Sequence, residues 1–373
     1  MPTVRILSIS RDFHVLFYEG LSICIKMFVY YMTRLEARDH WRKVAAEFVR
    51  RHAAGENTNK IIEDLKTRYA GIGPGNQQRL RDLIASAPVV PAVPAEGCVA
   101  SKKIFAPYTE SWSLQEGWNG AKKLIDIPTP NLTLAFVLDG GNGVPKFDGS
   151  MDINSYVDQG KAVQAKGGVI RISFGGASGT ELAISVKNDA KLVAAYESVI
   201  KMYNTRHIDF DVEGASTADT ESIKRRNKAI VALQEKYPDL KVDYTLATMQ
   251  TGMSSECVAI LTDAAKQGVR VNAVNLMAMD YGNGEKQMGK AAISAAKAAK
   301  KQCDDIKLNY AGIGITPMIL VNDTAPETFT VDNAKEVTDF AKKTAWVNFV
   351  GMWATGRDTK SWEFTKTFTK FNA

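Results

Sequence analysis

The stretch RHIDFDVEG, residues 206–214, alternates apolar and acidic side chains, and this alternation decides how the rest of the chain is read. Side chains on a β-strand point alternately to opposite faces, so Asp209, Asp211 and Glu213 share one face and the apolar residues between them share the other. Successive acids lie about 6.6 Å apart on such a strand, close enough to raise the pKa of at least one of them. The acidic face therefore needs water, a metal ion or a cavity with polar contents, and the flanking sequence must decide among these.

The composition is that of a globular protein larger than one typical domain. The chain has 373 residues, of which 45% are hydrophobic and 24% charged, so we expect one large domain and an appendage. Residues 1–95 hold 14 of the 47 basic and 9 of the 41 acidic residues, which leaves residues 96–373 with a net charge of +1. A larger part so close to neutral gives no support to nucleic-acid binding.

The first 97 residues divide by composition into three segments. Residues 1–35 contain the apolar run 13–32, but Glu19 and Lys26 interrupt it and no small-residue cleavage site follows, so we predict neither a transmembrane helix nor a clean signal peptide. Residues 36–87 show helical spacing and are expected to form a small helical unit, either a partner-binding module or a strut packed on the main domain. The Pro- and Ala-rich residues 88–97 are expected to be an extended linker.

Regular strand candidates begin after the linker. They are residues 103–108, 132–138, 168–175, 207–213, 242–248, 273–279, 311–320 and 349–353, with helical stretches between them such as 189–204, 221–237 and 336–345. A (β/α)8 barrel typically needs about 250 residues, and no GxGxxG follows the first strand to favour a doubly wound sheet. We therefore predict an α/β fold, a (β/α)8 TIM barrel over residues 98–373, preceded by a small N-terminal helical region.

A barrel of this kind accounts for the acidic face of residues 206–214. Ile208, Phe210 and Val212 would pack outward on the ring of helices, and the acids would project into the barrel interior. Active sites of these barrels lie at the C-terminal ends of the strands. Glu213, at the end of its strand, is therefore expected to stand in the mouth.

Four short motifs on these strands resemble the glycoside hydrolase family 18 chitinases, of the compact barrel type without the insertion domain. They are SFGG (173–176), DFDVE (209–213), MAMDYG (277–282) and GMW (351–353), and the resemblance covers residues 103 to about 370. Two departures are present. Arg206-His207 replace the leading Asp-Gly of the DGxDxDxE signature, where we expect a local adjustment, and Met279 occupies the position of the signature tyrosine of the sixth strand.

The resemblance implies a retaining, substrate-assisted hydrolysis, in which the 2-acetamido oxygen of the sugar attacks the anomeric carbon. Glu213 would be the general acid and base, which requires a pKa near the working pH. Asp211, sharing a proton with Asp209, would turn to the acetamide nitrogen and stabilise the oxazolinium intermediate. Tyr281 and Asp280 would hold the acetamido group, with Tyr281 taking over the role of the missing signature tyrosine.

The remaining expected site residues have binding or structural roles. Trp353 would form the floor of the sugar site, and Tyr108 and Trp112 would extend the cleft. Met279 is counted with the substrate-binding residues, although packing suits a methionine better than chemistry does. Ser173, Gly175 and Gly176 are expected to keep the third strand close to the fourth. No cofactor and no metal ion is implied, since the cysteines at 24, 98, 257 and 303 lack metal-ligand spacing. A Cys257–Cys303 disulfide and free buried thiols are alternatives.

The sequence thus predicts a chitinase, an enzyme that hydrolyses β-1,4 bonds between N-acetylglucosamine units. The alternatives are an endo-β-N-acetylglucosaminidase acting on N-glycan cores, which shares the DxDxE acids, and a non-hydrolytic chitin-binding lectin, which usually lacks the acid that Glu213 provides here. We expect chitin or N-acetylglucosamine oligosaccharides as partners, no nucleic acid and a monomer. The family resemblance implies secretion, although the N-terminus makes a poor signal peptide.

Overall fold

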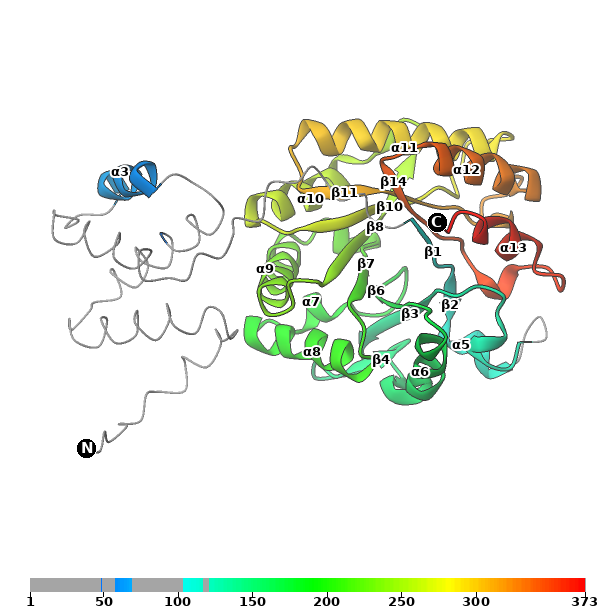
Figure 1. Ribbon diagram of the computed structural model, residues 1–373, viewed down its shortest axis with the longest axis horizontal. Helices are drawn as coiled ribbons and strands as arrows, with labels where there is room; N and C mark the ends of the chain where they lie inside the picture. Colours follow the sequence, from blue (N-terminus) through cyan, green and yellow to red (C-terminus); the bar gives the residue numbers. More distant parts are fainter. Residues whose placement is uncertain (1–47, 49–57, 69–102, 117–120, 373) are drawn as a thin grey trace. The chain divides into compact units, whose positions relative to one another are not determined.

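The chain divides into two compact units, residues 1–97 and 98–373. The computed structural model describes residue 48 and residues 58–68 of the first unit and residues 103–116 and 121–372 of the second (Figure 1). In the first unit α3 spans Thr58–Arg68 and buries Ile61, Ile62 and Leu65 on one face. The expected apolar segment 1–35, the linker 88–97 and most of the helical unit 36–87 lie outside the described residues, as do Cys24 and Cys98. No helix in the described part of the chain is both long and apolar enough to span a membrane.

The second unit is a closed barrel of parallel strands. In chain order the described barrel strands are β1 (Ile104–Phe105) and β2 (Tyr108–Glu110), β3 (Leu132–Asp139), β6 (Ile170–Gly175), β7 (His207–Asp211), β8 (Lys241–Met249), β10 (Val271–Met277), β11 (Tyr310–Thr316) and β14 (Val347–Val350). The ring closes because β1 pairs with β14 while β2 pairs with β3, both in parallel. The predicted (β/α)8 barrel is confirmed, with β1 and β2 together taking the first of its eight strand positions.

The first strand position differs from the expected continuous strand 103–108. The chain pairs with β14 on one side up to Phe105 and with β3 on the other from Tyr108 onward. Pro107 lies between the two ladders. Its carbonyl accepts from the Thr133 amide of β3 at 2.9 Å, while the Ala106 and Tyr108 amides on either side of it donate to the Val350 and Met352 carbonyls. The division brings Tyr108 to the C-terminal end of the barrel.

Helices surround the barrel (Figure 1). The longer ones are α6 (Val157–Ala165), α8 (Asp189–Met202), α9 (Thr220–Lys236), α10 (Ser255–Gln267), α11 (Met288–Asp305), α12 (Val331–Lys343) and α13 (Glu363–Thr369). Several begin after a residue whose side chain accepts a hydrogen bond from a free backbone N–H group of the first turn. Asn188 caps α8, Asp219 caps α9 and Ser254 caps α10. These caps fix where each helix starts after its loop.

The two faces of β7 have the environments that the sequence predicts. Phe210 packs outward, edge to face with Tyr196 of α8 at 5.1 Å between ring centroids, and Ile208 and Val212 are buried in the same hydrophobic core. Asp209 points inward, where it contacts polar side chains of β2, β6 and β8. The interior of the barrel is therefore a polar network enclosed by an apolar shell.

Candidate active site

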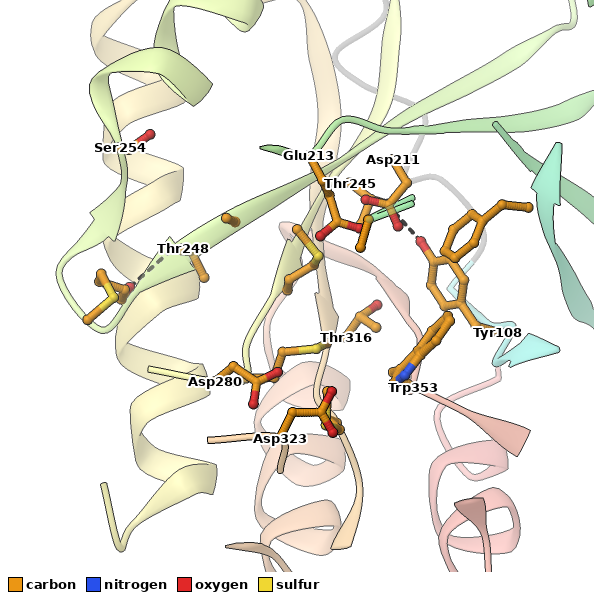
Figure 2. Close-up of a pocket in the computed structure, with 17 residues that line it drawn as sticks. Tyr108, Asp211, Glu213, Thr245, Thr248, Ser254, Asp280, Thr316, Asp323 and Trp353 are labelled. Carbon is orange, nitrogen blue, oxygen red and sulfur yellow. Dashed lines mark hydrogen bonds between the residues drawn. The ribbon is translucent and has the colours of Figure 1, made fainter. Parts of the chain in front are cut away.

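A cavity of about 510 Å³ opens at the C-terminal ends of the barrel strands (Figure 2). Six of the residues predicted for catalysis or binding line it, namely Tyr108, Asp211, Glu213, Met279, Asp280 and Trp353. Figure 2 shows the Asp211 and Glu213 carboxyl groups together at one side, Trp353 and Tyr108 on a flank, and Asp280 and Asp323 on the opposite wall. The end of β7 thus delivers two acids into a space that has an aromatic side.

Asp209 lies below the cavity, where it accepts three hydroxyl hydrogen bonds and forms an ion pair with Arg171. Its Oδ2 accepts from Ser173 Oγ at 2.6 Å and Tyr108 Oη at 3.0 Å. Its Oδ1 accepts from Thr245 Oγ1 at 2.8 Å and lies 2.7 Å from Arg171 Nη2. Burial raises the pKa of Asp209, and Arg171 opposes this rise. With four partners the carboxylate is held in one orientation, and Ser173 does more than the strand spacing that was predicted for it.

Asp211 and Glu213 are close enough for each carboxyl group to change the pKa of the other. Burial, followed by the charge of Glu213, raises the pKa of Asp211 well above its ordinary value, and the hydrogen bond to Glu213 adds to this rise. Burial also raises the pKa of Glu213, and the hydrogen bond from Asp211 lowers it in part. Burial and the neighbouring acid therefore favour the protonated form of Asp211 strongly. The charge of Asp209, the partner that the sequence analysis expected, raises the pKa of Asp211 as well.

One oxygen of Asp211 has no hydrogen-bond partner within the described residues. Its Oδ1 is fully buried from solvent and unpaired, while the residue lines the cavity. A buried unpaired acceptor costs free energy unless something supplies a donor. This atom is therefore an acceptor available to an N–H or O–H group that enters the cavity.

Two glycines let the neighbouring strand approach the acids. Gly175 pairs with Asp211 and has a φ of +102°, and a Cβ there would lie 2.0 Å from the Asp211 carbonyl oxygen. Gly176 has a φ of +92°, and a Cβ there would lie 2.7 Å from the Phe136 ring. Only glycine tolerates both this conformation and this approach. The geometry gives both glycines of the SFGG motif a packing reason.

Three aromatic rings form one side of the cavity. Phe136 and Trp353 stack with centroids 5.5 Å apart and planes 18° apart, and Tyr108 lies 5.9 Å from Trp353. Phe136, in the middle of β3, was missed by the sequence analysis because nothing in its apolar strand distinguishes it from a core residue. Trp112, on α5 (Ser111–Glu116), is 45% exposed and does not line the cavity.

The loop after β10 carries the opposite wall. Asp280 has a φ of +48°, so the chain turns there, and Met279 and Asp280 line the cavity whereas Tyr281 does not. Tyr281 packs in the hydrophobic core, and its hydroxyl group has no hydrogen-bond partner in the described part of the chain. Its amide donates to the buried Glu327 carboxylate, which also accepts from the amides of Asn283 and Gly284. The turn at Asp280 therefore separates the two residues that were predicted to act together.

The deep interior contains ionic groups that the sequence analysis did not single out. Arg171 of β6 and Asp243 of β8 are both fully buried and form an ion pair at 2.8 Å. His207 Nε2 lies 2.7 Å from the same Asp243 oxygen. This is the adjustment at the Arg206-His207 departure, since the neighbouring strand β8 places a carboxylate beside His207. A signal was available, because an arginine in the apolar run 168–175 needs an acid partner once it is buried.

The described thiols and metal-ligating groups show no further chemistry. Cys257 and Cys303 are both free and buried, so the disulfide alternative is wrong. Among the residues that the structure describes, no three His, Cys, Asp or Glu side chains are arranged to hold a metal ion.

Comparison with known proteins connects this barrel to chitinases. A probable bifunctional chitinase/lysozyme of Escherichia coli K12 is 33% identical over 280 residues, and endochitinase 11 of Metarhizium anisopliae is 36% identical over 217 residues. These matches cover 69% and 53% of this chain. The chain spans only 31% and 41% of the lengths of the two relatives. No protein-family model matches the chain.

Solved structures extend the comparison. Catalytic-site mutants of active domain 2 of a thermostable chitinase from Pyrococcus furiosus, in complex with chito-oligosaccharides, superpose with a TM-score of 0.60 at 28% identity, covering 73% of this chain and 96% of that one. A GH18 chitinase of Flavobacterium johnsoniae, at 14% identity and a TM-score of 0.51, covers 73% of this chain and 94% of its own and shares the fold. The barrel of this chain is therefore similar to chitinase catalytic domains, and it shares its fold with a chitinase of glycoside hydrolase family 18.

Proposed function

We propose that the chain is a chitinase that hydrolyses β-1,4 bonds between N-acetylglucosamine units with retention of configuration, and that Glu213 is its general acid and base. The observation that carries the proposal is the buried, unpaired Oδ1 of Asp211 next to Glu213, and we infer that these two carboxyl groups share one proton. An N-acetylglucosamine unit supplies both groups that this pair needs, an amide N–H for the oxygen and a glycosidic oxygen for the proton.

The first step follows from the arrangement of the acids. Asp211 and Glu213 come from one strand, so they lie on the same side of a bound sugar and cannot flank its anomeric carbon as the two carboxyl groups of other retaining enzymes do. The nucleophile is then the carbonyl oxygen of the substrate's own 2-acetamido group. Glu213 protonates the leaving oxygen, the glycosidic bond breaks, and the acetamido oxygen bonds to the anomeric carbon as an oxazolinium ion.

Asp211 changes partner during this step. As its oxygen accepts the acetamide N–H, its proton passes along the existing hydrogen bond to Glu213, which then donates it to the leaving group. The Asp211 carboxylate left behind stabilises the positive charge of the oxazolinium ion in a buried site, where electrostatic interactions are strong. Glu213, now a carboxylate, removes a proton from the water that opens the ring, and the proton returns to the pair.

The cavity walls position the sugar. The stacked Phe136 and Trp353 rings offer an apolar face to the sugar ring, and Tyr108 continues it. Met279 and Asp280 form the facing wall, and we place Asp280 near the acetamido group. The proposal does not extend to Tyr281, whose side chain lies outside the cavity, and Trp112 is retained only as an outer contact for longer chains.

The experiment compares the purified chain with its Glu213→Gln variant on soluble chito-oligosaccharides and on a glycoprotein with N-glycans. Shortened oligosaccharides from the first substrate only, seen by mass spectrometry and absent with Glu213→Gln, are the expected result. Cleavage only within the N-glycan core would replace the chitinase by an endo-β-N-acetylglucosaminidase. Binding without cleavage of either substrate would replace the enzyme by a lectin.

A further inference from the structure

A buried arginine lies in the interior of the barrel, below the catalytic acids. Arg171 is fully buried on β6 and its guanidinium group lies against the face of the Phe349 ring, 4.4 Å from its centroid. Nη2 lies 2.7 Å from Asp209 Oδ1 and Nε lies 2.8 Å from Asp243 Oδ2. Nη1 donates to the hydroxyl groups of Tyr108 and Thr133, each at 3.3 Å. The guanidinium group thus bridges two carboxylates on neighbouring strands.

The far side of the bridge is fixed by further partners. Asp243 Oδ2 also lies within hydrogen-bond distance of His207 Nε2, at 2.7 Å. Asp243 Oδ1 accepts a hydrogen bond from the Asn272 side chain at 2.7 Å. Asp243 is held anionic, since His207 and Arg171 together outweigh burial and its pKa lies below the ordinary range. The carboxylate therefore anchors Arg171, because an arginine that has lost its acid partner in such a site would be a buried unpaired charge.

The acidic side chains around Arg171 outnumber the basic ones. The acids that face the interior are Asp209, Asp211 and Glu213 on β7 or just after it and Asp243 on β8. The other titratable neighbours are Tyr108 of β2 and His207 of β7. The remaining strands contribute uncharged side chains, namely Thr133 of β3, Asn272 and Asn275 of β10 and Phe349 of β14. An arginine keeps its charge at any working pH. It is the permanent cation of this group.

Building on the proposed function, we propose that Arg171 is a positioning residue that keeps Asp209 anionic and oriented, while Asp243 holds Arg171 in place. The exchangeable proton of the reaction then stays on the Asp211–Glu213 pair. Asp209 already accepts hydrogen bonds from three hydroxyl groups and lies beside one guanidinium group, four contacts that suit an anion. A proton on it would break at least one of them. Asp209 is then a fixed negative charge, and the pair above it is the part that moves the proton.

The charges of Arg171 and Asp243 change the pKa of Asp209 in opposite directions. The charge of Arg171 lowers the pKa values of both Asp209 and Asp211, whereas the charge of Asp243 raises the pKa of Asp209. Removing the cation should therefore move the acid titrations upward in pH. Asp243→Asn removes the negative charge but keeps an oxygen that can accept from Arg171, so it should leave the cation in place and move the titrations downward. A role that is merely structural would give loss of activity in both variants without this difference in direction.

The experiment measures kcat/KM against pH for soluble chito-oligosaccharides with the full chain and the variants Arg171→Gln, Arg171→Lys and Asp243→Asn. We expect the profile of Arg171→Gln to move to higher pH by on the order of one pH unit, that of Asp243→Asn to move to lower pH by less, and that of Arg171→Lys to stay near the parent. Shifts of the same sign in Arg171→Gln and Asp243→Asn, or no shift in either, would overturn the inference. Absence of hydrolysis by the parent chain would instead refute the proposed function.

A second measurement does not depend on turnover or on the folding of Arg171→Gln. The carboxyl carbons of the aspartates in the full chain are followed by ¹³C NMR against pH in the parent and in Asp243→Asn, whose side chain has nearly the same volume. The inference predicts that Asp209 titrates at lower pH in the variant. An unchanged or higher Asp209 titration in a folded Asp243→Asn protein contradicts it.

Discussion

Replacing Asp211 with asparagine should lower activity and raise stability in the same protein. Asparagine keeps the shape of the side chain, but it has no proton to pass to Glu213 and no charge to offset the oxazolinium ion. Removing one preorganised electrostatic contact to a transition state costs about 10²–10³ in kcat, or roughly 3–4 kcal/mol. We expect a loss of this size in kcat with little change in KM, since the charge develops only in the transition state.

The stability change follows from the direction of the Asp211 pKa. Burial, and then the charge of Glu213, raises this pKa well above that of an unfolded aspartate. The folded state is therefore favoured while Asp211 is protonated, and this advantage is lost as the pH rises through the folded pKa. Asparagine does not ionise, so the variant should be more stable than the parent at pH 8, by roughly 1 kcal/mol, and the difference should vanish near pH 4.

The assay combines steady-state kinetics on a chito-oligosaccharide with urea unfolding at pH 4 and pH 8. Asp158→Asn is a matched control, because this aspartate is exposed on α6 and forms an exposed ion pair with Lys161, so neither quantity should change. An Asp211→Asn protein that retains kcat within about tenfold, or that is less stable than the parent at pH 8, would refute the reasoning.

Three further substitutions test other parts of the structure. Trp353→Ala removes the ring that stacks on Phe136 and should lower kcat/KM by about 10²-fold, with Trp353→Phe retaining most of it in the same kinetic assay. Glu327→Ala leaves three backbone amides of the loop after β10 without their acceptor and should lower the free energy of unfolding by roughly 3 kcal/mol, as measured in urea; no loss would show that the loop is held otherwise. Arg226→Met leaves the buried Glu181 carboxylate unpaired and should cost about 3–5 kcal/mol, most of which the double variant with Glu181→Met should recover by the same measurement.

The barrel and the acids could be predicted because their signals are periodic. Alternation in residues 206–214 requires Phe210 outside and Asp209 inside once helices cover the sheet, and the structure confirms both. The strand ends that carry Glu213 and Trp353 follow from the same register. These are local properties, since each can be read from a few neighbouring residues.

The parts that could not be predicted depend on contacts between distant segments. Tyr281 follows Asp280 in the motif, but the left-handed turn at Asp280 and the capture of the Tyr281 amide by Glu327, 46 residues later, direct its ring into the core. Arg171 is set by two acids on other strands, at positions 209 and 243. Neither arrangement produces a recognisable spacing of residues along the chain, so the sequence alone could not predict it.

The central claim is that Glu213 donates the proton while the substrate's own acetamido group attacks. Anomer-resolved ¹H NMR of chito-oligosaccharide hydrolysis, recorded before the product anomers equilibrate, tests this most directly when the parent and Glu213→Gln are compared. The account predicts that the β-anomer forms first with the parent, and that Glu213→Gln binds the oligosaccharide without cleaving it. An α-anomer formed first, or undiminished hydrolysis by Glu213→Gln, would contradict it.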